Sequence, residues 1–102
     1  MFLKKSSTLP ARSGLIAWAQ LTEQTEASRE RVTEIVEMGW IVPVRTAENE
    51  LLFKPDDVYR IRKLERICRD FELTTIGGSI IVDLLERIET LEQQVAELKR
   101  LL

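Results

Sequence analysis

The chain has 102 residues, of which 44% are hydrophobic and 31% are charged, and its formal net charge is −2. This length allows one small domain with an extension, and the slightly acidic balance gives no basic field to attract nucleic acid or an anionic membrane. No apolar stretch approaches the roughly 20 residues of a membrane span. Histidine is absent and Cys68 is the single cysteine, so we expect no enzyme, no metal and no cofactor, and a reducing, cytoplasmic setting.

The N-terminal segment lacks a regular apolar pattern. Residues 1–14 mix Lys, Ser, Thr, Pro and Gly, which predicts a flexible leader without the apolar core of a secretory signal. Leu15 to Trp18 can add one short strand, and a first short helix is expected over Ala19 to Thr25. We expect the Trp18 indole to lie in the core, because apolar residues surround it in the sequence.

The next segment is built like the second half of a helix-turn-helix. Ser28 is a good N-cap for a helix over Arg29 to Met38, and Gly39 supplies the left-handed position that commonly ends a helix. In a DNA-binding protein this helix would enter the major groove. From residue 20 to residue 39, however, the chain carries five acidic and two basic side chains, and phosphates repel such a face. The helix-turn-helix pattern is typical of nucleic-acid binding, whereas the negative charge of the helix favours a protein partner.

Two short apolar runs then predict a β-hairpin. Ile41 to Val44 and Leu51 to Phe53 flank the polar stretch Arg45 to Glu50, as in the wing of a winged helix-turn-helix. Pro43 is better tolerated on an edge strand than in the centre of a sheet.

A third helix is expected to begin at Pro55, whose fixed φ suits the first helical position. Asp56 with Arg60, and Glu65 with Arg69, have the spacing and order of favourable ion pairs on one helix. The predicted core-facing stripe of this helix, in which the cysteine serves as a small buried hydrophobe, comprises Val58, Ile61, Leu64, Cys68 and Phe71.

The C-terminal segment, residues 74–102, has the most regular pattern, and Thr74 or Thr75 can cap it. Apolar residues three and four positions apart form a seam with β-branched side chains at a and leucine at d, which favours a two-stranded coiled coil. At 1.5 Å per residue the helix is about 42 Å long, more than a small domain can cover, so we expect a homodimer. The alternative is a helix folded back on the core. Arg87 would face Glu92 in a parallel pair, but this is a single charge match, so the direction of the two helices stays open. The predicted dimerisation residues are Ile81, Leu84, Ile88, Leu91, Val95, Leu98 and Leu102.

These elements predict a mainly α fold, with a winged helix-turn-helix domain over residues 15–73, a small β-hairpin wing, and a long coiled-coil helix over residues 74–102. The order resembles the MerR-type winged helix-turn-helix proteins. The match is specific at Thr25 to Ser28, at Gly39 with Pro43 and Arg45, and at Asp57-Val58.

The chain departs from those regulators where they contact DNA. Its second helix offers Thr33-Glu34-Ile35 in place of an arginine followed by aromatic residues. Its wing reads Asn49 to Phe53 without the usual Gly-aromatic-Arg run. The phosphate contacts of the MerR-type proteins are therefore not carried over to this sequence.

The CbpM-type chaperone modulators resemble the chain more closely. The resemblance rests on the pattern T-x-x-S…EIV-x-x-G from Thr25 to Gly39, on Phe53 with Asp56-Asp57, and on the segment from Arg69 to Leu73 that leads into residues 81–88. It covers roughly residues 15–102. It implies a non-enzymatic inhibitor that binds the J-domain of a DnaJ-like or CbpA-like co-chaperone.

The resemblance also implies that such a J-domain offers a basic helix, which an acidic helix with nearby apolar residues would complement. We therefore predict partner contacts by Glu30, Glu34 and Glu37, with Trp40 or Phe53 as anchor. In the alternative, the glutamates are an ordinary solvated face and both aromatics are core. Two other functions stay open at this point. One is a MerR-like DNA-binding transcriptional regulator that uses Arg29, Arg31 and residues of the wing, and the other is an adaptor that merely dimerises.

Overall fold

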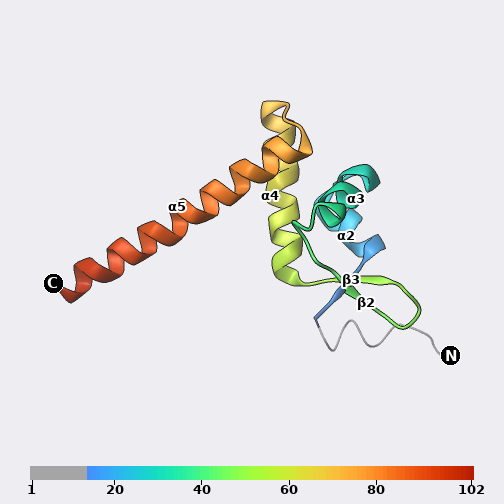
Figure 1. The fold of residues 1–102 in the computed structure, drawn as a ribbon, viewed down its shortest axis with the longest axis horizontal. Helices are drawn as coiled ribbons and strands as arrows, with labels where there is room; N and C mark the ends of the chain where they lie inside the picture. The colour runs from blue at the N-terminus through green and yellow to red at the C-terminus, as the bar shows by residue number, and fades with distance from the viewer. Residues whose placement is uncertain (1–13) are drawn as a thin grey trace.

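The computed structural model describes residues 14–102, so the leader predicted for residues 1–14 lies almost wholly outside the described residues. The elements follow one another as β1 (Ile16–Ala17), α2 (Trp18–Thr25), α3 (Arg29–Glu37), β2 (Val44–Arg45), β3 (Leu51–Phe53), α4 (Pro55–Phe71) and α5 (Thr75–Leu101). In Figure 1, α2, α3, the strands and α4 gather at one end, and α5 projects away from them to the C-terminus. The mainly helical fold with a small wing and a long last helix is as predicted.

The helix boundaries follow local signals in the sequence. The Ser28 hydroxyl accepts a hydrogen bond from the Arg31 backbone N–H at 3.1 Å, and Thr74 caps α5 in the same way through Gly77, also at 3.1 Å. Beyond α3 and its C-cap residue, Gly39 adopts a φ of +76°, in the left-handed region. The predicted caps and the predicted glycine stop are all confirmed.

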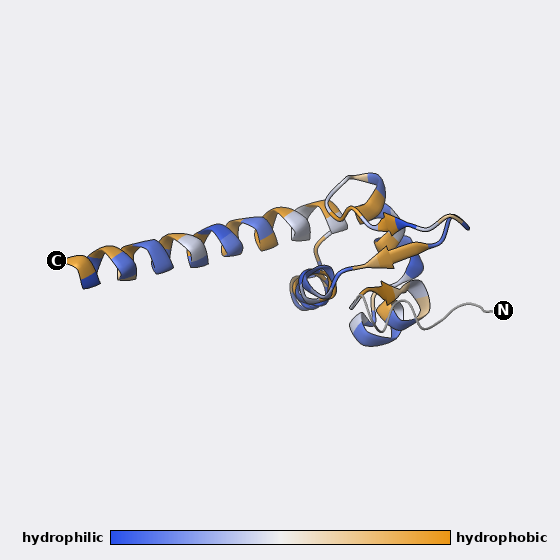
Figure 2. Ribbon diagram, turned by 90° about the horizontal axis from the view of Figure 1, so that it is seen from below, coloured by the Kyte–Doolittle hydropathy of each residue, from blue (hydrophilic) through white to orange (hydrophobic). Residues whose placement is uncertain are grey.

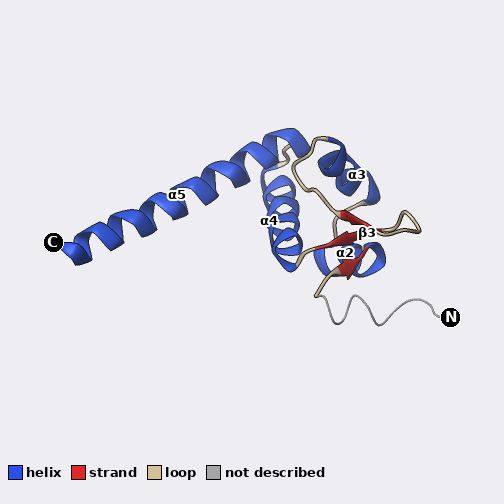
Figure 3. Ribbon diagram, turned by 60° about the horizontal axis from the view of Figure 1, so that its bottom comes forward, coloured by secondary structure: helices blue, strands red, loops and turns tan. Residues whose placement is uncertain are grey.

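The three strands form one antiparallel sheet in the order β1-β3-β2, drawn red in Figure 3. Leu52 lies at the centre, opposite Ala17 on one side and Val44 on the other. The short first strand and the hairpin are confirmed, but the hairpin begins at Val44 rather than at Ile41. The Ile41 N–H donates to the carbonyl of Ile35 at 3.3 Å, and its side chain is only 1% exposed, so Ile41 belongs to the end of α3 and to the core.

The hydrophobic core lies between α2, α3, the sheet, α4 and the first turns of α5. Trp18 packs against it as predicted, with its ring centroid 6.1 Å from that of Phe53. Cys68 is buried, also as predicted, but Phe71 is 69% exposed and the prediction for it was wrong. Phe71 is the last residue of α4, and the chain turns away at the next residue, so nothing packs over this end of the stripe. Ile67 is buried in this part of α4 instead.

The helices α4 and α5 pack closely at Gly78. A Cβ atom at this position would lie 2.9 Å from Cδ1 of Leu64 and closer still to Sγ of Cys68. The core-facing side of α5 consists of Thr75, Gly78, Ser79 and Val82. This contact fixes the direction in which α5 leaves the domain.

Beyond these first turns, α5 is unsupported. Every residue from 87 to 102 is exposed, and Figure 2 shows hydrophobic and hydrophilic segments alternating along the projecting helix. Among the described residues, no helix is long and apolar enough to cross a membrane.

Candidate partner-binding and self-association surfaces

The predicted acidic face lies on α3. Val32 and Ile35 are buried on the inner side of this helix, which turns Glu30, Glu34 and Glu37 towards solvent. The three are not equivalent, because an Oε atom of Glu34 accepts a hydrogen bond from the Thr75 hydroxyl at 2.7 Å. Glu34 therefore ties α3 to the first turn of α5. Within residues 14–102, Glu30 and Glu37 have no ion-pair partner, and they remain available as charges.

The two predicted aromatic anchors lie in different environments. Phe53 is 0% exposed on the central strand, where it pairs with Ile16, so its assignment as a contact residue was wrong: a fully buried ring has no surface to offer. Trp40 is half-buried just after α3. Its indole N–H donates to an Oδ atom of Asp83 at 2.9 Å, which attaches the residue to α5.

Arg60 of α4 organises the contacts around Trp40, which sequence reasoning did not anticipate. Its guanidinium lies 4.0 Å from the Trp40 ring centroid and donates to the Trp40 carbonyl at 3.2 Å. The same group pairs with Asp83 at 3.0 Å and with Glu86 at 3.1 Å. The i,i+4 ion pair predicted between Asp56 and Arg60 is therefore replaced by contacts with α5. This Arg60 network joins the end of α3, the middle of α4 and the base of α5.

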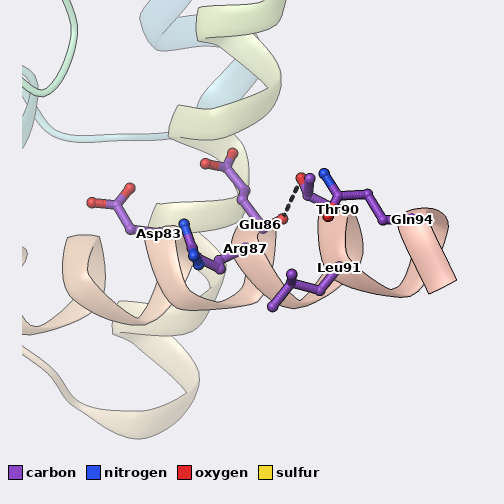
Figure 4. Close-up of a pocket in the computed structure, with 6 residues that line it drawn as sticks. All are labelled: Asp83, Glu86, Arg87, Thr90, Leu91 and Gln94. Carbon is purple, nitrogen blue, oxygen red and sulfur yellow. Dashed lines mark hydrogen bonds between the residues drawn. The ribbon is translucent and has the colours of Figure 1, made fainter.

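The predicted dimerisation seam is exposed along its whole length, from Ile81 at 38% to Leu102 at the C-terminus. At 100° per residue, the seam lies on the side of α5 opposite the one that packs on the domain. A shallow apolar hollow on it is lined by Ile88, Leu91, Glu92 and Val95. Figure 4 shows the neighbouring polar flank, where the Thr90 hydroxyl donates to the Glu86 carbonyl at 3.0 Å. One side of α5 thus packs on the domain through its first turns, and the opposite, apolar side has no partner within the described chain.

Comparison with known proteins places this architecture in a family. The model of the MerR HTH family regulatory proteins matches residues 16–100. The chaperone modulatory protein CbpM of Coxiella burnetii, in the Dugway 5J108-111 and RSA 331 strains, is 30% identical over 89 residues, which span 87% of this chain and 84% of the relative. The chain belongs to the CbpM-like group within the MerR helix-turn-helix family. The predicted resemblance is confirmed at this level.

Within this MerR-type frame, the second helix is poorly equipped to read DNA. Arg31, one of the two cations of α3, forms an ion pair with Glu65 of α4 at 3.0 Å, and both side chains are mostly buried. Glu65 also forms the predicted pair with Arg69, at 3.3 Å. Arg29 is then the one exposed cation on α3, beside three carboxylates. The face that would meet phosphates is negative.

Neither a metal site nor a reactive thiol is found in the described part of the chain. No group of three or more His, Cys, Asp or Glu residues there has the arrangement of a metal site. Burial raises the pKa of the Cys68 thiol above its ordinary value, so the group is protonated at neutral pH. What the fold displays is two surfaces, the acidic side of α3 and the apolar seam of α5.

Proposed function

We propose that this protein is a chaperone modulator that binds the J-domain of a DnaJ-like or CbpA-like co-chaperone in the cytoplasm and restrains it without catalysis. The single observation that carries the proposal is a helix-turn-helix whose second helix is acidic and exposed, in a chain whose CbpM relatives are named chaperone modulatory proteins. Glu30 and Glu37 supply charge that no basic residue in the described chain neutralises. A basic helix docked there would be covered and withheld from its other partners.

We further propose that two copies associate through α5. The seam from Ile81 to Leu102 is a continuous row of exposed large apolar side chains that faces away from the domain, and such an exposed apolar surface is typical of an interaction site. Pairing two such seams would bury leucine against β-branched residues in a two-stranded coil. Each dimer would then present two acidic α3 faces.

A transcriptional role is the second candidate, because the family model that matches is that of MerR regulatory proteins. It predicts sequence-selective binding of duplex DNA in the nanomolar range. The acidic α3 and the engaged Arg31 predict instead only weak binding, at about 10⁻⁴ to 10⁻⁶ M or weaker at physiological salt. A fluorescence titration with mixed duplexes separates the two.

Calorimetry with the J-domain of the co-chaperone from the same organism tests the leading proposal. The wild type should bind, and the affinity should fall as salt rises, because exposed charges are screened beyond about 8–10 Å at 0.10–0.15 M salt. Replacing Glu30 and Glu37 together by lysine should weaken binding at low salt, chiefly through a lower association rate, while Glu34 and its contact with Thr75 stay intact.

The matched control reverses Glu48 and Glu50, which are exposed in the wing and change the net charge equally. This variant should bind almost as the wild type does. Equal affinity of the α3 variant and the wild type at low salt would show that the acidic face is not the site.

A further inference from the structure

Three large apolar side chains are exposed directly beyond the acidic helix. Met38 is 43% exposed, Val42 70% and Val44 43%. The chain turns at Gly39, directs Trp40 to the Arg60 network and buries Ile41, so Met38 before these two residues and Val42 after them are left in solvent. Single exposed hydrophobic residues are ordinary. Three of them within seven residues, next to a helix with unpaired carboxylates, require an explanation.

The aromatic candidates leave the role of apolar anchor open. Phe53 has no exposed surface, and Trp40 is held by its indole N–H and by the cation above its ring. Withdrawing either from its place would break core packing or the Arg60 network. Met38 and Val42, in contrast, can be covered without any rearrangement of the domain. Methionine is also suited to such a contact because its flexible thioether adapts to irregular surfaces.

We propose that Met38 and Val42 are the apolar anchor of the partner surface, and that the segment they receive is a cationic amphipathic helix. This assignment rests on the proposed function and specifies the binding site for it. Glu30 and Glu37 are seven residues apart, about 10 Å along α3, and Met38 follows Glu37 directly. The surface thus offers two negative charges over two helical turns and ends in apolar side chains.

A helix with basic residues and apolar residues at helical spacing matches both parts of this surface. Its cations would lie along α3, and its apolar side chains would reach Met38 and Val42. Charge would then steer the encounter, whereas the apolar contact would hold the complex. A second copy of this chain is the less suitable occupant, because its own α3 carries the same negative charge.

The test compares wild type with a variant carrying Met38→Ser and Val42→Ser, using the immobilised J-domain of the co-chaperone from the same organism. We expect the variant to bind about 10-fold more weakly or worse, through faster dissociation at an unchanged association rate. Tyr59→Ser, at an exposed aromatic on α4, is the control and should bind like the wild type. Thermal melting should show that both variants stay folded, because none of the replaced side chains belongs to the buried core.

Photo-crosslinking gives a second readout that does not depend on affinity. A photoreactive residue placed at Val42 should capture the J-domain, and one at Tyr59 should not. If the wild type binds and the serine variant binds equally well, or if the Val42 probe captures only another copy of this chain, the anchor assignment is wrong. If the wild type does not bind the J-domain at all, the proposed function is overturned, and the assignment with it.

Discussion

Replacing Arg60 with alanine should loosen the base of α5 and lower the stability of the whole domain. The change removes two partly exposed ion pairs, a hydrogen bond to the Trp40 carbonyl and a cation–π contact at 4.0 Å. Partly exposed ion pairs contribute about 0.2–1 kcal/mol each, the hydrogen bond about 1 and the cation–π contact about 0.5–1. Since these contributions share one side chain and are not additive, we expect a loss of about 2 kcal/mol.

Urea unfolding followed by circular dichroism, at a fixed protein concentration, measures this loss. For a domain of this size, about 2 kcal/mol corresponds to a fall in Tm of roughly 8–16 °C. Arg62→Ala on the same helix is the control, because Arg62 is exposed and forms no ion pair within residues 14–102. A double-mutant cycle with Asp83→Ala then isolates the coupling across α4 and α5. A loss below about 0.5 kcal/mol, equal to that of the control, would refute the idea that this network supports α5.

Three further outcomes are expected. Leu91→Asp, which puts a charge in the exposed seam, should convert a dimer into a monomer at micromolar concentration, and sedimentation of wild type and variant as equal monomers would contradict the coiled coil. Gly78→Val should destabilise by about 1–3 kcal/mol, because its Cβ would lie 2.9 Å from Leu64 Cδ1. Gly77→Ala should cost less in the same melt, because a Cβ there would meet only the Thr74 hydroxyl at 3.3 Å and the Leu73 Cβ at 3.9 Å. Burial raises the pKa of the Cys68 thiol, so the folded state keeps a proton that the unfolded state loses near pH 9.0. Stability should therefore fall as pH rises from there through the folded-state pKa, more steeply than in Cys68→Ala. Equal slopes in the two proteins would be evidence against a buried thiol.

The features of the fold that depend on local chemistry could be predicted from the sequence. Ser28, Gly39, Pro55 and Thr74 each act on the backbone within a few residues, so the helix boundaries follow from residue type alone. The apolar spacing of the last helix likewise required no knowledge of its surroundings. The division into a domain over residues 15–73 and a dimerisation helix over residues 74–102 remains a prediction.

The features that depend on long-range packing could not be read in this way. Asp56 and Arg60 have ideal i,i+4 spacing, yet Arg60 reaches residues more than 20 positions away, because the packing of α4 on α5 brings two carboxylates within range. In the sequence, Phe53 and Trp40 are equivalent as aromatic candidates. Only the structure shows that Phe53 is fully buried on the central strand, where it pairs with Ile16. Ion pairs between separate helices leave no periodic signal along the chain, and the bridge between Arg31 and Glu65 is a second example.

The hydrogen bond from Thr75 to Glu34 joins the helix proposed to meet the partner to the helix proposed to meet a second copy. Trp40 and Asp83 make a second such connection. If these contacts couple partner binding at α3 to pairing through α5, thermodynamic linkage requires that each event change the affinity of the other by the same factor. A co-chaperone that binds the paired form more tightly than the single chain must then itself drive pairing. The ratio of modulator to co-chaperone in the cell would set both the occupancy of the acidic face and the assembly state of the modulator.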